Sequence, residues 1–258
     1  MDRRSILALN RINRQFYRDS AAEFSRTRAR SWPGWQRMLP QLIRRWPARR
    51  PLSVLDVGCG NARFAPFLRR SGRPFTYFGV DASSRMLRIA RAALGATPLR
   101  RRSVTADPIQ RCEIQRVDLV GAPSALPRRR FDLIVAFGLL HHIPGETTRL
   151  RLMAALRGRL RPDGLLIVTL WQFLSEPRYR GRIVPWSQLP RGRHPIDLSQ
   201  LEAGDTLLSW GRAPRALRFC HSIDPSEARR LVRGARLRCL ETFAADGRSG
   251  ALNLYLLL

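Results

Sequence analysis

Short apolar runs alternate with helical stretches over residues 52–171, and this alternation constrains the fold more than any other feature. The predicted strands are Ser53–Val57, Thr76–Val80, Ile114–Val117, Asp132–Phe137 and Leu165–Leu170, and the predicted helices between them are Arg63–Arg70, Ser83–Leu94 and Glu146–Leu160. Apolar runs separated by helices indicate parallel strands buried on both faces. The sequence therefore predicts an α/β fold with a doubly wound, mostly parallel sheet, whose strand carboxyl ends share one ligand-binding edge.

Both ends of the chain add to this sheet. Residues 1–50 predict an amphipathic helical cap with breaks at Trp32-Pro33-Gly34 and Trp46-Pro47. Residues 51–258 form the main domain, in which residues 172–218 are rich in proline and lack periodicity, so they predict an irregular, lid-like insertion. The last predicted elements are a helix at Pro225–Gly234 and two strands, Leu237–Phe243 and Leu252–Leu258, which would complete a seven-stranded sheet as an antiparallel hairpin at its edge.

The charge of the chain points to an anionic partner. The 258 residues carry a net charge of +28, with 47 basic and 19 acidic side chains, and every basic residue is arginine. A biased genome explains the choice of arginine over lysine, but it does not explain the surplus of basic residues. Such a surplus creates a positive field that attracts polyanions. We therefore expect a nucleic-acid partner, with an anionic membrane surface as the alternative.

Other features of the sequence exclude several classes of protein. No apolar run approaches the 18 residues of a membrane span, and the N-terminus lacks a signal-peptide pattern, so we expect a cytoplasmic protein without a membrane partner. The four cysteines form no CxxC motif and have no histidines at ligand spacing. Neither a disulfide framework nor a metal site is predicted.

The segment Val54–Asn61 joins the first strand to a glycine-rich turn. Gly58 and Gly60 lack a Cβ atom, so their backbone can adopt positive φ and approach a ligand closely. Asp81 directly follows the second strand, where a carboxylate can accept hydrogen bonds from both hydroxyls of a ribose. A dinucleotide-binding GxGxxG motif is not completed, because its sixth position is Arg63. The pattern therefore disfavours a pyrophosphate.

The arrangement resembles the class I S-adenosylmethionine-dependent methyltransferases. Four elements occur in the order of that family: VLDVGCGN at 54–61, Asp81, Val117-Asp118-Leu119 and Phe131–Val135. The resemblance implies a Rossmann-like methyltransferase fold and S-adenosylmethionine as cofactor, with Asp118 on the adenine amino group and Leu119 against the ring. Asp56 suits a ligand that carries an amino group and a sulfonium. The predicted cofactor-binding residues are Asp56, Gly58, Gly60, Asn61, Asp81, Ala82, Asp118, Leu119 and Phe137.

Ala62 is one departure from that family, because a third glycine is common at its position. A second feature, His141-His142, follows the fourth strand and lies at the expected ligand edge. These histidines either line the pocket as a base or pack beside the cofactor. Paired histidines are common here in methyltransferases of many substrates, so we favour packing.

Segments outside the sheet carry a narrower resemblance, to the tRNA wobble-uridine carboxymethyl methyltransferases. They are Glu23–Arg28 with Trp32-Pro33, Arg218–Ile223, Asp246–Arg248 and Leu252–Tyr255. The resemblance implies that the chain methylates a carboxymethyl group on the wobble uridine of tRNA. In the eukaryotic relatives a small activating protein partner exists, and by the same resemblance a partner of this kind is expected here.

A carboxymethyl substrate determines what its site must provide. Carboxyl pKa values lie near ~4, so the group is ionised at pH 7 and needs no general base. It needs in-line positioning, which arginine can provide through a bidentate fork. The candidate catalytic residues are Arg26, Arg28, Arg218 and Arg248, with His221 as a further hydrogen-bond donor. Two alternatives remain open: a small-molecule O- or N-methyltransferase, and a catalytically silent scaffold.

Overall fold

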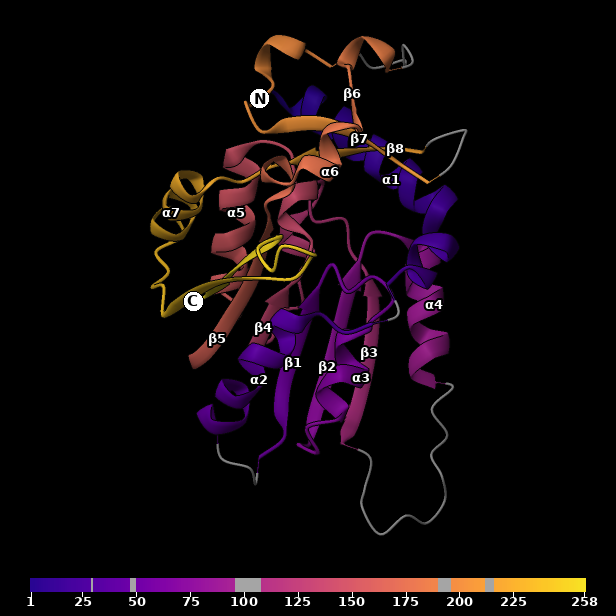
Figure 1. The fold of residues 1–258 in the computed structure, drawn as a ribbon. Coiled ribbons are helices and arrows are strands. Elements are labelled where there is room, and N and C mark those ends of the chain that lie inside the picture. The colour runs from indigo at the N-terminus through magenta and orange to yellow at the C-terminus, as the bar shows by residue number, and fades with distance from the viewer. Residues whose placement is uncertain (29, 47–49, 96–107, 190–195, 212–215) are drawn as a thin grey trace.

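The computed structural model describes residues 1–28, 30–46, 50–95, 108–189, 196–211 and 216–258, and its main sheet has seven strands in the order β3-β2-β1-β4-β5-β10-β9 (Figure 1). The strands are β1 (Leu52–Val57), β2 (Phe75–Asp81), β3 (Ile109–Arg116), β4 (Phe131–Ala136), β5 (Leu160–Trp171), β9 (Glu241–Ala245) and β10 (Asn253–Leu257). Strands β1 to β5 pair in parallel, and β10 is antiparallel to both of its neighbours. The predicted seven-stranded, mostly parallel sheet is confirmed.

Helices cover both faces of this sheet, as a doubly wound fold requires. On one face lie α2 (Pro33–Arg45) and α3 (Phe64–Arg69), and on the other lie α5 (Glu146–Arg157) and α7 (Pro225–Gly234). Strand β1 serves both cores because successive side chains point to opposite faces. Val54 packs with α2 and α3, whereas Leu55 and Val57 pack with α5 and α7. Four of the six residues of β1 are therefore apolar, and the exceptions are Ser53 and Asp56.

The N-terminal helix α1 (Arg3–Arg26) crosses the carboxyl edge of the sheet, where it packs against α4 (Ser84–Gly95) and β8 (Ala216–His221) (Figure 1). The Asp2 carboxylate caps its first turn by accepting a 2.7 Å hydrogen bond from the Ser5 amide. The predicted break at Trp32-Pro33-Gly34 is where α2 begins. Pro47, at the second predicted break, lies outside the described residues.

The insertion is more ordered than its composition suggested. It contains α6 (Pro177–Arg180) and a second, antiparallel sheet of three strands, β6 (Ile183–Val184), β7 (Asp205–Trp210) and β8 (Ala216–His221). These strands have two to six residues each, which is too short for alternation to stand out from the surrounding prolines and arginines. Cross-strand pairs such as Leu207 with Phe219 hold them in register.

Three strand starts differ by several residues from those predicted. Strand β5 begins at Leu160 rather than Leu165, and its first five residues are partly or fully exposed. Strand β3 begins at Ile109 rather than Ile114, because most of its side chains are exposed and give no apolar run. Strand β9 begins at Glu241 rather than Leu237, and it still forms the expected antiparallel hairpin with β10. Within the described ranges, no helix combines the length and apolarity needed to cross a membrane.

Candidate active site

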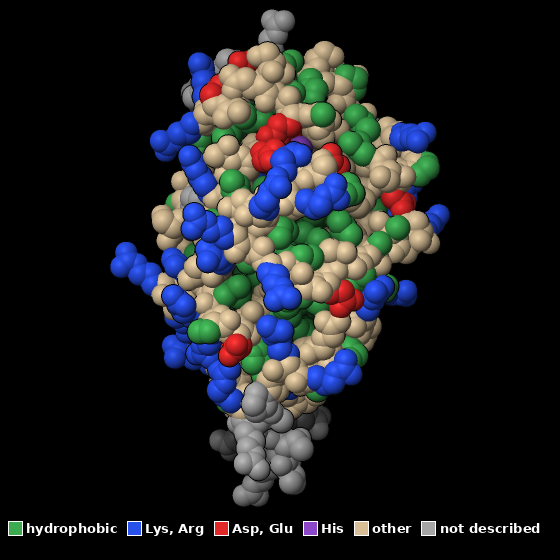
Figure 2. Space-filling view, turned by 90° about the vertical axis from the view of Figure 1, so that its left-hand side faces the viewer, with side chains coloured by type: hydrophobic (Ala, Val, Ile, Leu, Met, Phe, Trp, Pro, Cys, Tyr) green, Lys and Arg blue, Asp and Glu red, His purple; other side chains and the backbone are tan. Residues whose placement is uncertain are grey.

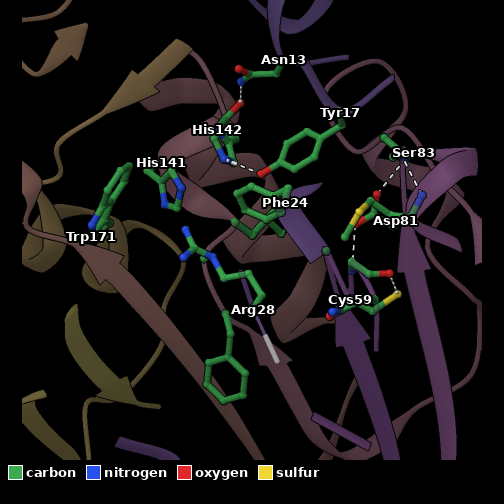
Figure 3. A pocket seen from close by; sticks show the side chains of 18 of the residues that line it. Asn13, Tyr17, Phe24, Arg28, Cys59, Asp81, Ser83, His141, His142 and Trp171 are labelled. Atoms are coloured by element: carbon green, nitrogen blue, oxygen red, sulfur yellow. Dashed lines mark hydrogen bonds between the residues drawn. The ribbon is translucent and has the colours of Figure 1, made fainter. Parts of the chain in front are cut away.

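A cavity of about 540 Å³ lies at the carboxyl edge of the main sheet, between the strand ends, α1 and the second sheet. The structure brings all the predicted cofactor-binding residues to its wall: Asp56, Gly58, Gly60, Asn61, Asp81, Ala82, Asp118, Leu119 and Phe137. In Figure 3, Asp81 and Cys59 lie at one end of this cavity, and His141 and Trp171 lie at the other. We call these the cofactor end and the acceptor end.

The glycine turn after β1 adopts the backbone that its sequence predicts. Gly58 and Gly60 have φ values of +72° and +55°, and a Cβ atom at Gly58 would lie 3.0 Å from Leu139 Cδ1. Glycine meets both requirements without strain. Ala62, which replaces the glycine common in the resembled family, also has positive φ, at 56°. That backbone costs an L-residue roughly 1–2 kcal/mol.

Asp81 holds the turn and still offers acceptor capacity to the cavity. Its Oδ2 accepts a 2.9 Å hydrogen bond from the Gly60 amide, and its Oδ1 accepts a 2.8 Å bond from the Ser83 amide (Figure 3). A carboxylate oxygen has two lone pairs, so each oxygen can accept one further bond. Burial raises the pKa of Asp81, and the backbone hydrogen bonds oppose this effect. The arrangement fits two vicinal hydroxyls of a ribose.

Asp56 lies deeper at the cofactor end. Its Oδ2 accepts a 2.6 Å hydrogen bond from the Tyr77 hydroxyl, and its side chain is almost fully buried. Burial raises the pKa of Asp56 to about 7, although the Tyr77 bond favours the carboxylate. A carboxylate desolvated in this way gains most from a cationic ligand. Asp56 therefore suits the ammonium of a methionine moiety.

Two residues of α1 contact Asp118, and the sequence did not predict this contact. The Asn10 amide donates to both Asp118 oxygens at 3.1 and 3.3 Å, and Arg14 forms an ion pair with Asp118 at 3.6 Å. The backbone amides of Val120 and Gly121 also donate to Asp118 Oδ1. Helix α1 therefore closes over the end of the cavity where the family resemblance expects adenine.

Sequence reasoning missed several cavity residues on α1. They are Asn10, Asn13, Arg14, Tyr17, Arg18 and Phe24. The available signal was a polar stripe at helical spacing, because residues 10, 13, 14 and 17 share one face of a helix.

The two histidines after β4 lie at the acceptor end. The His142 Nδ1–H donates to the Phe219 carbonyl at 3.0 Å, which leaves Nε2 to accept from the Tyr17 hydroxyl at 3.0 Å (Figure 3). With Nδ1 as donor and Nε2 as acceptor, the ring is the neutral tautomer that carries its proton on Nδ1. Burial, with Arg218 nearby, lowers the pKa of His142 to about 3. The His141 Nδ1 has no hydrogen-bond partner within the described ranges, and burial lowers its pKa well below 6.5.

Two arginines place positive charge at the acceptor end. Arg218, on β8, is 4% exposed, and its guanidinium lies 5.0 Å from the Trp171 ring centroid. Its Nε has no hydrogen-bond partner, and no ion pair of Arg218 occurs in the part of the chain that the structure describes. Arg28 points into the same space (Figure 3). Burial first, and then the charge of Arg218, lower the pKa of Arg28.

No cavity carboxylate is available to neutralise these cations. Besides Asp56, Asp81 and Asp118, the lining contains only Asp246 among the described acidic residues. The Asp246 carboxylate accepts from the Gly34 amide and from the Asn253 and Tyr255 side chains at 2.7–2.9 Å. The acceptor end is therefore cationic, and it suits an anionic ligand.

Three predicted catalytic residues lie outside the cavity lining. Arg26, at the end of α1, and Arg248, in the β9–β10 turn, are exposed. The other two predicted residues, Arg28 and Arg218, line the cavity, and Arg28 follows the end of α1 at Arg26 by two residues. His221 is buried on β8, but successive strand residues point to opposite faces, and the side chain of His221 is absent from the cavity wall.

His221 belongs instead to a buried ion network. Its Nδ1 lies 2.7 Å from Asp205 Oδ1, and its Nε2 lies 2.8 Å from Glu227 Oε2. Arg149 pairs with Glu227 at 2.6 Å and with Glu202 at 2.5 Å. Burial opposes a charged imidazole, but the bonds to Asp205 and Glu227 outweigh it and raise the pKa of His221. The network ties β8 to α5 and α7.

The family comparison agrees with this geometry. The sequence profile described as "Methyltransferase domain" matches residues 21–241, and the chain belongs to this family of S-adenosylmethionine-dependent methyltransferases. A solved S-adenosylmethionine-dependent methyltransferase from Methanosarcina mazei superposes with a TM-score of 0.61 at 19% identity, over 84% of this chain and 95% of that one. The cofactor and the Rossmann-like methyltransferase fold are thus confirmed.

Relatives found by sequence similarity are named for different substrates. "Probable tRNA methyltransferase 9B" of Bos taurus is 23% identical over 176 residues, which are 67% of this chain and 32% of that protein. Trans-aconitate 2-methyltransferase of Methylobacterium radiotolerans is 29% identical over 140 residues, 54% of this chain and 46% of that protein. The chain thus spans less than half the length of either relative.

Replacing Asp81 tests the cofactor end. Asp81→Ala removes the charged acceptor that two ribose hydroxyls would use, so affinity for S-adenosylhomocysteine should fall tenfold to a hundredfold (~1.5–3 kcal/mol) in isothermal titration. Asp163→Ala, which removes an exposed aspartate of β5, is the matched control and should bind normally. Unchanged affinity in Asp81→Ala would show that the ribose lies elsewhere.

Replacing His221 tests the ion network. His221→Gln leaves Asp205 and Glu227 without a cation between them, so the free energy of unfolding should fall by roughly 3–5 kcal/mol. The pKa of His221 is raised in the folded state, so its contribution is fully present below about pH 6.5 and is lost as the pH rises through the raised value.

Urea unfolding of both proteins across the pH range measures this difference. Other titrating groups are common to the two proteins and cancel in the comparison. The stability gap between wild type and variant should narrow as the pH rises. A gap that widens with pH would mean that His221 is neutral in the fold.

Proposed function

We propose that this methyltransferase esterifies a carboxylate, and that the carboxylate is a carboxymethyl group on the wobble uridine of tRNA. The observation that carries the proposal is the guanidinium of Arg218, which lines the cavity, is 4% exposed, and has no ion pair and no hydrogen bond at Nε within the described residues. Burying a charge without a partner costs several kcal/mol, and an anionic ligand would recover much of that cost. Arg28 gives the same site a second positive charge.

The residues of the acceptor end can position a carboxylate without deprotonating it. Two guanidinium groups provide donors in planar forks, which orient a carboxylate. The Arg218 guanidinium lies over the rings of Trp171 and Phe16, with its carbon 5.0 and 5.4 Å from the ring centroids. S-adenosylmethionine, when bound, supplies a methyl group on a sulfonium, and the carboxylate oxygen takes it as a methyl ester, leaving S-adenosylhomocysteine. Positioning of this kind contributes several kcal/mol as effective molarity.

The tRNA assignment rests on the relatives and on the charge. One relative is named as a tRNA methyltransferase, and the short segments that resemble the wobble-uridine enzymes include Arg28 and Arg218. The surplus of 28 positive charges favours a polyanion. Figure 2 shows arginine side chains spread over one whole face of the molecule, so the field is not confined to the cavity. A small activating protein partner is a further proposal from the same resemblance.

His141 supports a second candidate function. Its buried Nδ1 has no partner in the described part of the chain, and its lowered pKa keeps the ring neutral at pH 7. A neutral imidazole in the cavity wall can accept a proton from a hydroxyl or an amine. A small-molecule O- or N-methyltransferase would use this group, whereas a carboxylate acceptor would not.

Replacing Arg218 distinguishes acceptor binding from cofactor binding. Arg218→Met keeps the apolar stem beside Phe16 and Trp171 but removes the charge, so methyl transfer should fall by about a hundredfold or more. Affinity for S-adenosylhomocysteine should survive. Arg26→Met, an exposed arginine outside the cavity, is the control and should retain activity. Loss of cofactor binding together with activity would assign Arg218 a folding role instead.

The substrate itself is tested with labelled cofactor. Incubation of the protein with S-adenosylmethionine and total tRNA, followed by nucleoside analysis, should show label in a base-labile methyl ester of a carboxymethylated uridine. Label that appears only with small hydroxyl or amine acceptors, and that is lost in His141→Gln, would support the second candidate. Saponification distinguishes these outcomes, because esters release methanol and ethers do not.

A further inference from the structure

Six exposed arginines form a basic surface at the cofactor end of the cavity, four of them in its wall and two one helical turn from it. We call them the arginine rim, and they come from α1, α4 and the end of β3: Arg11, Arg14, Arg18, Arg85, Arg88 and Arg116. Four of them line the cavity itself, namely Arg14, Arg18, Arg85 and Arg116. Arg11 and Arg88 lie on the same helix faces as Arg14 and Arg85, outside the cavity wall. The rim thus joins the cavity to the outer surface.

Helix periodicity explains why these side chains gather. Arg11, Arg14 and Arg18 are three and four residues apart, and such residues are neighbours on one helix face. Arg85 and Arg88 have the same relation on α4, which packs against α1. Arg14 and Arg18 of one row and Arg85 of the other line the same cavity, so the two rows meet at its mouth.

The rim keeps most of its charge unneutralised. Helix α4 contains no acidic residue, and α1 contains Asp19 and Glu23 as its acidic positions. Arg14 pairs with Asp118 at 3.6 Å, and this is the one ion pair of a rim arginine within the described ranges. Arg116 is oriented by donating to the Ala82 carbonyl at 3.2 Å, which leaves the rest of its guanidinium for a ligand. The surface is open, cationic and continuous with the site.

We propose that the arginine rim binds the phosphate backbone of the RNA whose modified nucleotide enters the cavity, a proposal that rests on the tRNA function above. Guanidinium forks match phosphate geometry, and their binding releases condensed counterions. An anionic membrane is the less suitable partner. A helix that lies on a membrane inserts large apolar side chains, and α1 and α4 expose none in the described structure.

A charge-matched pair of variants tests the rim. Arg11→Gln with Arg88→Gln removes two rim charges without touching a residue of the cavity wall. Arg229→Gln with Arg233→Gln removes two exposed charges from α7, on the opposite side of the fold (Figure 1). A tRNA transcript is titrated against both variants and the wild type at several salt concentrations from about 50 to about 200 mM. S-adenosylhomocysteine affinity serves as the folding control.

The rim variant should bind the transcript roughly tenfold more weakly near 0.1 M salt, and its salt slope should fall by about two. The α7 variant should lose much less affinity. Equal losses in the two variants would overturn the rim while leaving the tRNA function intact. A wild-type protein that binds no tRNA but binds vesicles containing phosphatidylserine would overturn both. Failure of the wild type to methylate tRNA that carries the carboxymethylated uridine, with rim-dependent binding retained, would overturn the proposed function alone.

Discussion

The buried side-chain amide of Asn13 joins three segments that are far apart in the sequence, and the acceptor end depends on it. Its Oδ1 accepts a 2.8 Å hydrogen bond from the Phe219 amide on β8, and its Nδ2 donates to the His142 carbonyl at 3.3 Å. An unsatisfied buried amide is costly, so the three segments are held in one arrangement. That arrangement turns Arg218 of β8 toward the cavity.

Negative and positive side chains lie at opposite ends of the cavity. Each kind is stabilised by partners other than an opposite charge across the cavity. The aspartates at the cofactor end already accept hydrogen bonds, as Asp81 does from the Gly60 and Ser83 amides. Asp81 orients the turn, and no ion pair joins an aspartate to Arg28 or Arg218 in the described part of the chain. Aromatic rings rather than carboxylates surround those guanidinium groups. The cofactor end is therefore preorganised for a cationic ligand group, and the acceptor end is preorganised for an anionic one.

The cofactor end could be predicted because its residues are placed by local rules. Gly58, Gly60 and Asp81 occupy strand ends, and parallel strands bring those ends to one edge whatever the rest of the chain does. The acceptor end could not be predicted in the same way. Arg28 lines the cavity and Arg26 does not, and this depends on where α1 stops. His221 shares a motif with Arg218, but a strand directs neighbouring side chains to opposite faces, and His221 joins Asp205 and Glu227.

By itself, the sequence determined the sheet, the cofactor class and the sign of the charge. Strand periodicity and glycine conformation depend on a few neighbouring residues, and the net charge depends on composition alone. Only the tertiary structure decided which polar residues of α1 enter the site, such as Asn10 on Asp118. It also decided that β8 presents Arg218 to the cavity and His221 to an ion network. These outcomes depend on contacts between segments more than a hundred residues apart, such as the bond between Asn13 and Phe219, and no local pattern encodes them.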